Sequence, residues 1–131
     1  MNRARWHSKA IWIPQHGILV LGGHNANFRG EYSVELLRES SSGCAFEWTY
    51  LAHLLETSSC PLVAQVNERV FVHNANQSLP RFQMLNLKHI PYKEWTCINC
   101  SVPLNEVFEA WSMTATIDGI LLPGLMDISA L

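Results

Sequence analysis

Cys97 and Cys100 are separated by two residues, a spacing that occurs in zinc sites and in redox pairs. A structural zinc site needs two more ligands at a similarly short spacing, but Cys44 and Cys60 lie 16 residues apart. A thioredoxin-like pair would open a helix after a strand, and that context is missing here. We interpret all four cysteines as ordinary reduced thiols and predict no metal site.

The other residues that commonly perform catalysis also lack the spacing that catalysis requires. Six histidines show no metal-ligand spacing, no glycine-rich phosphate loop is present, and no serine stands in a Gly-x-Ser-x-Gly turn. The nearby carboxylates Glu31 and Glu35 are more simply interpreted as solvated side chains. The sequence therefore predicts no enzyme, with no catalytic residues and no cofactor.

Two polar loops that follow apolar strands are better candidates for function. Both combine Asn amides, an Arg and a large apolar residue, a mixture that suits recognition of a peptide or another protein. The predicted partner-binding residues are His24, Asn25, Asn27, Phe28, Arg29, Asn74, Asn76 and Arg81. An ordinary turn-rich loop is the alternative for each single residue.

The composition limits the possible fold classes and the possible kinds of partner. The chain has 131 residues, of which 48% are hydrophobic and only 15% charged, so it predicts one folded domain rather than a disordered segment. The net charge is −2 and no basic run is present, which argues against nucleic acid as a partner. No apolar stretch is long enough for a membrane span, and no secretory signal is recognisable, so we expect a cytoplasmic protein.

A repeat positions these loops. The tripeptide Glu-Trp-Thr occurs twice, with Trp48 and Trp95 47 residues apart. Short aliphatic strands begin at Ile18, Val70 and Ile120, at steps of 52 and 50 residues. Such periods are typical of modular folds that build binding surfaces. The residue after each strand is Gly22, Asn74 or Gly124, types that readily adopt a left-handed backbone.

Each repeat is predicted to open with a β-hairpin and to continue with a third and a fourth strand. Tight turns, such as Asp118-Gly119, separate the hairpin strands. A loop is predicted over Arg38–Gly43, and the register of Phe82–Leu87 is open. Helical patterning is weak, and connecting loops are favoured over helices at Tyr50–Glu56 and Val102–Trp111. The predicted strands are Lys9–Ile13, Ile18–Leu21, Tyr32–Leu37, Phe46–Leu51, Leu62–Val66, Val70–His73, Phe82–Leu87, Glu94–Ile98, Met113–Ile117 and Ile120–Pro123.

A unit of about 50 residues with four strands, a hydrophobic run ending in Gly22-Gly23 and a Trp in the last strand resembles the kelch repeat. The resemblance implies an all-β fold: a partial kelch-like β-propeller built from four-stranded antiparallel blades. It also implies structural roles for Gly22, Gly23, Gly124 and for Trp48 and Trp95, which would pack between adjacent blades. A compact sandwich-like arrangement of the same strands is the alternative.

The resemblance covers residues 1–131 as a kelch-like repeat region. The first repeat spans about residues 5–52, the second about 60–100, and a partial third about 111–131. The second departs from the pattern, because Asn74-Ala75 replaces the glycine pair and Gln83 stands where an acidic residue is usual. Since propellers close with about 4–8 blades, we expect a fragment of a longer chain, with further blades as neighbours.

The resemblance also implies a function. Complete proteins of this family act as substrate-recognition subunits of ubiquitin ligases or as actin-associated scaffolds, although the adaptor domain of such a ligase, for example BTB, is missing here. We therefore expect a non-enzymatic protein-protein interaction module. The alternative is a propeller-type enzyme domain or a metal-binding domain with its site in the central channel.

Overall fold

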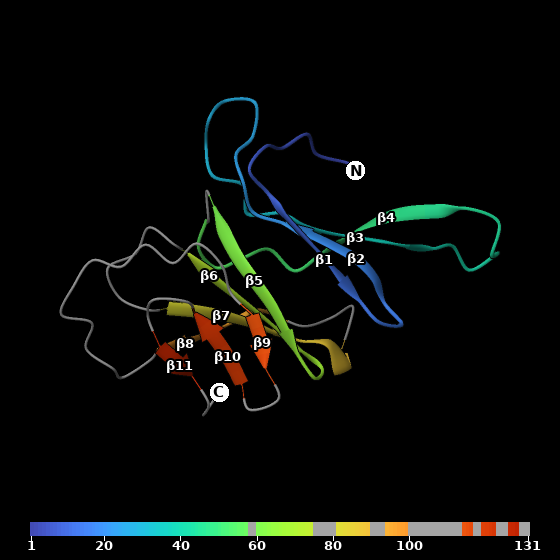
Figure 1. Cartoon of the computed structure of the whole chain (residues 1–131). Coiled ribbons are helices and arrows are strands. Elements are labelled where there is room, and N and C mark those ends of the chain that lie inside the picture. Colours follow the sequence, from blue (N-terminus) through green and yellow to red (C-terminus); the bar gives the residue numbers. More distant parts are fainter. Residues whose placement is uncertain are drawn as a thin grey trace.

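The computed structural model describes residues 1–57, 60–74, 81–89 and 94–99, together with three short strands between 114 and 128 (Figure 1). The described chain is all-β. It consists of two four-stranded antiparallel sheets and one three-stranded antiparallel sheet, with a single 3-10 turn at Leu87–His89. The predicted all-β class and the predicted four-stranded antiparallel sheets are confirmed.

The first sheet is formed by four consecutive strands in the order β1-β2-β3-β4, so that each strand pairs with the next one in the chain. Alternating apolar residues and tight turns account for this simple order. The turn before β2 contains Gln15 in a left-handed conformation with φ 67°. The bounds are β1 Lys9–Ile13, β2 Gly17–Leu21, β3 Val34–Glu39 and β4 Phe46–Leu51.

The second sheet repeats this order as β5-β6-β7-β8, and the third has the order β11-β10-β9. The strands of the second sheet are β5 Pro61–Val66, β6 Arg69–Asn74, β7 Arg81–Asn86 and β8 Thr96–Asn99. Those of the third are β9 Thr114–Thr116, β10 Gly119–Leu122 and β11 Met126–Ile128.

Ten predicted strands are present, with shifts of a few residues at their ends. Two predictions were wrong: Arg38 and Glu39 belong to β3 rather than to a loop, and β3 begins at Val34 instead of Tyr32. Ladder pairing with Glu47 and Phe46 keeps both residues extended. Strand β11 was not predicted. The connection after β4 is irregular, as predicted for that segment, whereas 102–111 lies outside the described residues.

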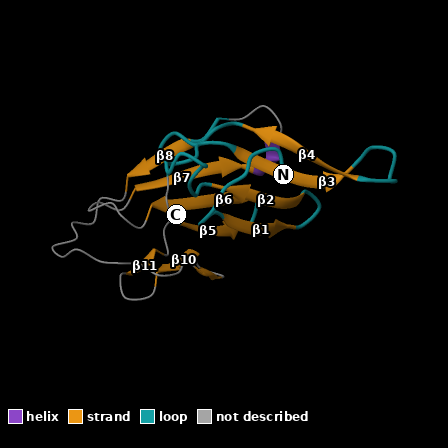
Figure 2. Cartoon of the chain, turned by 90° about the horizontal axis from the view of Figure 1, so that it is seen from above, coloured by secondary structure: helices purple, strands orange, loops and turns teal. Residues whose placement is uncertain are grey.

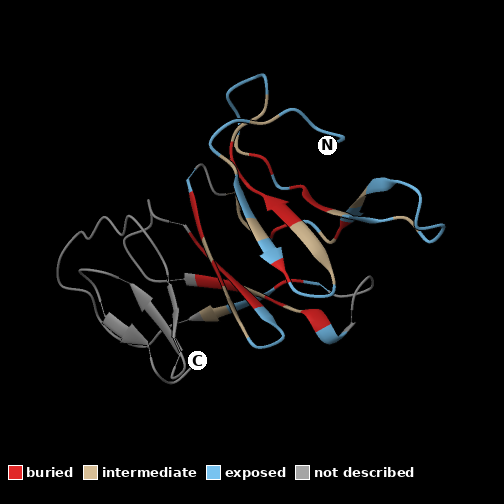
Figure 3. Cartoon of the chain, turned by 45° about the vertical axis from the view of Figure 1, so that its right-hand side comes forward, coloured by how far each residue is buried: buried red, intermediate tan, exposed pale blue. Residues whose placement is uncertain are grey.

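The core lies between the first and second sheets, which pack face to face (Figure 3). Side chains alternate across a strand, so Leu19 and Leu21 of β2 project to the same face, and they belong to one core cluster with Val70 and Val72 of β6. Each fully buried aliphatic side chain stabilises the fold by about 1.5–3 kcal/mol. The buried residues of this core are Ile13, Leu19, Leu21, Val34, Leu36, Leu51, Leu54, Val70, Val72, Leu85, Leu87 and Trp95.

Successive sheets also touch through their first strands. Strand β1 contacts β5 (Figure 2), and β5 contacts β9. The later strands of each sheet lead away from this line of contact. The first strand of every sheet is therefore the one nearest to its neighbouring sheets.

The open register of β7 is resolved by its pairing. Leu85 pairs with Val70 and Gln83 pairs with Val72, so both face the first sheet, whereas Phe82 faces away from it. Phe82 is nevertheless fully buried, as are all apolar residues of β6. Continuous apolar sequence in β6 thus reflects burial on both faces of the second sheet.

The glycine pair ends β2 as predicted. Gly22 and Gly23 have positive φ angles of 63° and 87°, which non-glycine residues rarely adopt. Gly23 also permits a close approach, because a Cβ atom there would stand 2.4 Å from the Trp6 carbonyl oxygen. Gly124 lies outside the described residues.

Candidate binding surface

The loop that follows β2 is held in one shape by Asn25. Its side-chain Oδ1 accepts hydrogen bonds from the backbone N–H groups of Asn27, at 2.9 Å, and Arg29, at 3.2 Å. The Asn25 backbone N–H donates to the Arg29 carbonyl, and Phe28 N–H donates to the Asn25 carbonyl. An Asn side chain that bonds its own loop is a common turn device. Asn25, predicted to bind a partner, therefore has a positioning role.

Phe28 stands at the tip of this loop. Its side chain is 78% exposed, although aromatic side chains usually gain free energy from burial. Its φ is 59°, a left-handed conformation that is an outlier for a bulky residue and costs on the order of 1–3 kcal/mol. The loop thus maintains an unfavourable backbone at the residue that it exposes most.

The N-terminal segment lies beside the loop and supplies a second aromatic ring. Trp6 and His24 exchange two backbone hydrogen bonds, of 3.0 and 2.8 Å, which bring their side chains together. The two rings stack at a centroid distance of 4.5 Å with an interplanar angle of 22°. The Trp6 indole Nε1–H donates to the Asn25 carbonyl at 3.3 Å, which ties the ring to the loop.

Phe28 and His7 complete a cluster around Trp6. Phe28 meets the Trp6 ring edge-on at 5.6 Å, and His7 does so at 4.6 Å on a backbone with φ 54°. Trp6 is itself 40% exposed. We refer to Trp6, His7, His24 and Phe28 as the aromatic cluster. Aromatic rings that are exposed yet rigidly held are typical of protein-binding surfaces.

A buried ion pair fixes the base of the cluster. Arg5 Nη2 contacts Glu35 Oε1 at 2.8 Å, and neither side chain is exposed to solvent. Arg5 also donates to the Ser33 carbonyl and hydroxyl oxygens, at 2.7 and 2.6 Å. Glu35 further accepts hydrogen bonds from the backbone N–H groups of Asn2 and Arg3. The pair therefore anchors the N-terminal segment, including Trp6, on the first sheet.

Glu31 and Glu35 were wrongly predicted to be solvated. Glu31 is only 4% exposed and accepts a hydrogen bond from the Ser33 backbone N–H. Glu35 is fully buried beneath the N-terminal segment, whose Asn2 and Arg3 N–H groups donate to it. Burial by itself raises the pKa of Glu31, but hydrogen bonds from Ser33 and the charges of Arg3 and Arg5 outweigh it and lower the pKa. The Glu31 carboxylate in turn raises the pKa of Arg3.

The net charge around the cluster is positive. Arg3 and Arg29 are exposed, whereas Glu31 and Glu35 are buried and paired with arginines. The exposed charge beside the Phe28 ring is therefore the guanidinium group of Arg29, the next residue in the loop, whereas Arg3 is paired with Glu31. Such a surface favours partners that carry carboxylates.

The structure brings together the five predicted residues of the first loop, of which Asn27, Phe28 and Arg29 are exposed. Of the three predicted residues of the second loop, Asn74 ends β6 and Arg81 begins β7, whereas Asn76 lies outside the described residues. Trp6 and His7 were not predicted as site residues. Only the pairing of the N-terminal segment with the loop, absent from any sequence pattern, brings them there.

The cysteine and histidine predictions were tested only in part. Cys44 and Cys60 are exposed free thiols, Cys97 is exposed, and Cys100 lies outside the described residues. Within the described part of the chain, no group of three or more His, Cys, Asp or Glu side chains could hold a metal ion. That part also contains no helix long and apolar enough to cross a membrane.

Comparisons of the chain with protein-family models, with curated proteins and with solved structures each find no match.

Proposed function

We propose that this chain is a non-enzymatic interaction module, built from kelch-like propeller blades, that binds a protein or peptide through the aromatic cluster. The architecture supports this proposal in two ways. Each sheet is formed by consecutive antiparallel strands in chain order, as in a propeller blade, whereas β-sandwiches commonly use connections that cross between sheets. The first strands β1, β5 and β9 contact one another in sequence, as the innermost strands of successive blades do.

One observation carries the binding proposal: Phe28 is 78% exposed on a strained backbone, above a stacked Trp6–His24 pair. A protein gains no stability from holding an aromatic ring in water. It gains affinity for a partner, because a rigid ring loses little conformational entropy when it becomes buried in a complex. Aromatic and Arg side chains are also the residues that most often dominate binding free energy.

The partner is a peptide segment with an apolar anchor and neighbouring carboxylates. The ring of Phe28 and the exposed edge of Trp6 would cover the anchor, and Arg29 would pair with a carboxylate. Two exposed free thiols, Cys44 and Cys60, suit a reducing compartment such as the cytoplasm as the place of this interaction.

Selection from a phage-displayed library of random peptides on the immobilised chain tests the proposal. We expect enriched peptides to contain an aromatic or aliphatic residue beside Asp or Glu. Isothermal titration calorimetry should then show that Phe28→Ala weakens binding by about 2 kcal/mol, or roughly 30-fold, as loss of a central anchor does. Arg29→Glu should also weaken binding, and the loss of affinity should be larger at low salt than at high salt, because salt screens interactions between charges.

Phe46→Ala is the matched control, because Phe46 is similarly exposed, at 75%, but lies on a hairpin distant from the cluster in the chain. Its peptide affinity should equal that of the unchanged protein. Selected peptides that bind Phe28→Ala and the unchanged protein equally would contradict the proposal. So would peptides that lose affinity only with Phe46→Ala.

A further inference from the structure

Strand β4 forms a free edge of the first sheet. Among the described strands it pairs with β3 alone, whereas β1, at the opposite edge of the same sheet, contacts β5 of the second sheet. The hairpin of β3 and β4 reaches away from the second sheet (Figure 1). An edge strand exposes a row of backbone N–H and C=O groups that can pair with another chain. The outer edge of β4 is therefore open to an added strand.

The hydrogen bonds of the hairpin show which residues of β4 turn their backbone outward. The Ser40 N–H donates to the Ala45 carbonyl at 2.7 Å, so the pair that precedes the ladder is a hydrogen-bonded one. Bonded and non-bonded pairs alternate along an antiparallel ladder, so every second residue of β4 directs its N–H and C=O away from β3. The outward-facing residues are Phe46, Trp48 and Tyr50.

One of these outward groups already accepts a hydrogen bond from an amide. The Asn2 side-chain Nδ2 donates to the Trp48 carbonyl oxygen at 3.3 Å, which confirms that this carbonyl points away from β3. The Asn2 amide thus occupies the place that the N–H of an added strand would take. This bond is long and exposed to solvent, so a peptide can displace it readily. In the described part of the chain, the outward backbone groups of Phe46 and Tyr50 have no such partner.

The sequence of β4 lacks the features that usually protect an edge strand. Its six residues, Phe-Glu-Trp-Thr-Tyr-Leu, include no proline and no lysine, and the aromatic residues and Thr favour an extended backbone. The ladder with β3 runs through all six residues without a bulge. Strand addition occurs at exposed edges of this kind.

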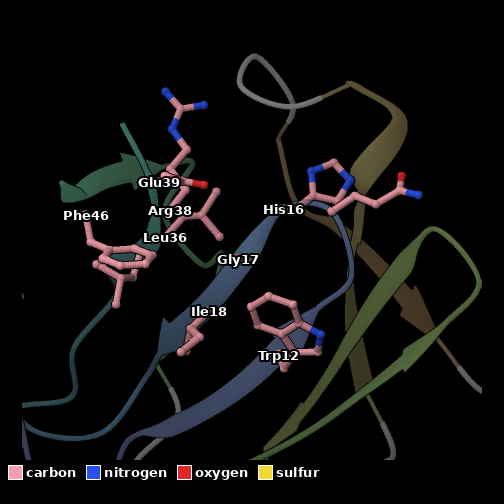
Figure 4. A pocket seen from close by; sticks show the side chains of 10 residues that line it. Trp12, His16, Gly17, Ile18, Leu36, Arg38, Glu39 and Phe46 are labelled. Carbon is pink, nitrogen blue, oxygen red and sulfur yellow. The ribbon is translucent and has the colours of Figure 1, made fainter. Parts of the chain in front are cut away.

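The side chains of β4 would flank an added strand. Those of the outward residues all lie on one face of the sheet, where Phe46 is 75% and Tyr50 49% exposed. Phe46 also borders a depression of about 380 Å³ together with Trp12 and Ile18, so its ring is not closely packed against the sheet (Figure 4). The opposite face carries the half-exposed carboxylate of Glu47. Pairs of aromatic with β-branched residues, and of opposite charges, stabilise neighbouring strands.

We propose that β4 binds an extended segment of another protein, which adds to the first sheet as an antiparallel fifth strand. A row of N–H and C=O groups at every second residue is complementary to an extended backbone and to few other ligands. Residues opposite the three outward residues would be β-branched or aromatic, and a Lys or Arg would stand opposite Glu47. The proposal goes beyond the proposed function, because β4 and the aromatic cluster consist of different residues.

A synthetic peptide, Lys-Val-Thr-Val-Lys-Val-Lys with blocked ends, is the probe. Antiparallel to β4, its valines would stand opposite Tyr50, Trp48 and Phe46 and its second lysine opposite Glu47. Titration of the isotope-labelled chain with up to about 2 mM peptide, followed by NMR, should give a dissociation constant on the order of 100 µM, because each new hydrogen bond replaces one to water. Bound peptide should slow amide hydrogen exchange at least about fivefold at the three outward residues and leave Glu47 and Thr49 unchanged.

Two variants of one residue separate the backbone from the side chain. Trp48→Pro removes the outward N–H without removing a bond to β3, so it should weaken binding of the probe at least about tenfold. Trp48→Val keeps the N–H and favours an extended backbone, so its affinity should stay within about threefold of the unchanged protein. Circular dichroism checks that both variants fold. Phe28→Ala should bind the probe as the unchanged protein does, which separates this result from that of the aromatic cluster.

The absence of any spectral change with the probe would overturn the proposal. So would protection from exchange that does not alternate along β4, because it would indicate contact with a sheet face instead of strand addition. A second peptide, with Pro in place of the central Val, should not bind, and equal binding of both peptides would contradict the proposal. Slower exchange of the same amides at high protein concentration without peptide would overturn it as well, because β4 would then pair with a second copy.

Discussion

The two Glu-Trp-Thr tripeptides stand at equivalent places in two sheets, yet their tryptophans have different environments. Trp95 is 2% exposed, lies in the core, and donates its indole N–H to the Ala52 carbonyl at 2.9 Å. Trp48 remains partly exposed on the face of the first sheet that does not pack against the second sheet. Trp95 therefore packs between the two sheets, whereas Trp48 does not. The difference teaches that a repeated motif specifies the position of a residue in a sheet, whereas the neighbouring sheet decides its burial.

The polar anchors of the two sheets differ in the same way. In the first sheet a buried carboxylate, Glu35, is paired with a buried arginine, Arg5. In the second sheet a neutral amide, Gln83, forms three hydrogen bonds with the connecting segment at Leu55 and Glu56. One sheet thus depends on charge at this position and the other does not.

The largest expected effect separates the two tryptophans. Trp95→Ala should lower the free energy of unfolding by about 3–5 kcal/mol, because it leaves a cavity in the core and an unpaired Ala52 carbonyl. Trp48→Ala should cost only about 1 kcal/mol, because its ring is already partly hydrated. Denaturant unfolding of both variants at low protein concentration measures the difference. Similar losses for the two variants would show that the faces are not distinct.

The second effect separates the polar anchors. Arg5→Met should cost about 3 kcal/mol, because it leaves the Glu35 carboxylate buried without its counter-charge. Gln83→Met should cost less, about 1–2 kcal/mol, because it leaves neutral N–H groups unpaired. The same unfolding measurement applies. A larger loss in the free energy of unfolding for Gln83→Met than for Arg5→Met would contradict this comparison.

The smallest effect is a difference in acid sensitivity. The pKa of Glu31 is lowered in the folded state, so its ionised form contributes stability above the ordinary glutamate value near 4.5. This contribution is lost as the pH falls below that value. Glu31→Gln should remove about 1 kcal/mol at pH 7 and flatten the decline of stability in acid. Unfolding curves measured between about pH 7 and pH 3 test this. Gln83→Glu would not be a suitable control, because it adds a titrating group. An unchanged acid profile in Glu31→Gln would contradict the assignment.

The sequence was sufficient for local structure. Alternating apolar residues predicted strands such as Lys9–Ile13 and Phe46–Leu51 with their observed bounds, and Gly22-Gly23 predicted the bend after β2. These features depend on residues close together in the chain. Phe28 and Arg29 were likewise predicted to lie in a loop after this strand, and the structure shows both exposed there.

Contacts between distant residues could not be predicted. Arg5 and Glu35 are 30 residues apart in the chain, and they pair only because the N-terminal segment folds onto the first sheet. Trp6 joined the loop for the same reason. The length of β3 was missed because Arg38 and Glu39 are polar, and polar residues continue a strand when ladder bonds hold them. Burial of Glu31 and Glu35 depended on partners that no local pattern reveals.

Hydroxyl-radical footprinting of tryptophan oxidation, read residue by residue by mass spectrometry, tests the comparison of the two faces most directly. Trp12 and Trp48 should be oxidised readily and Trp95 should be protected, because Trp12 is 64% exposed and Trp95 only 2% exposed. Oxidation of Trp95 as fast as that of Trp48 would contradict the account, because it would mean that the second sheet is not covered by the first.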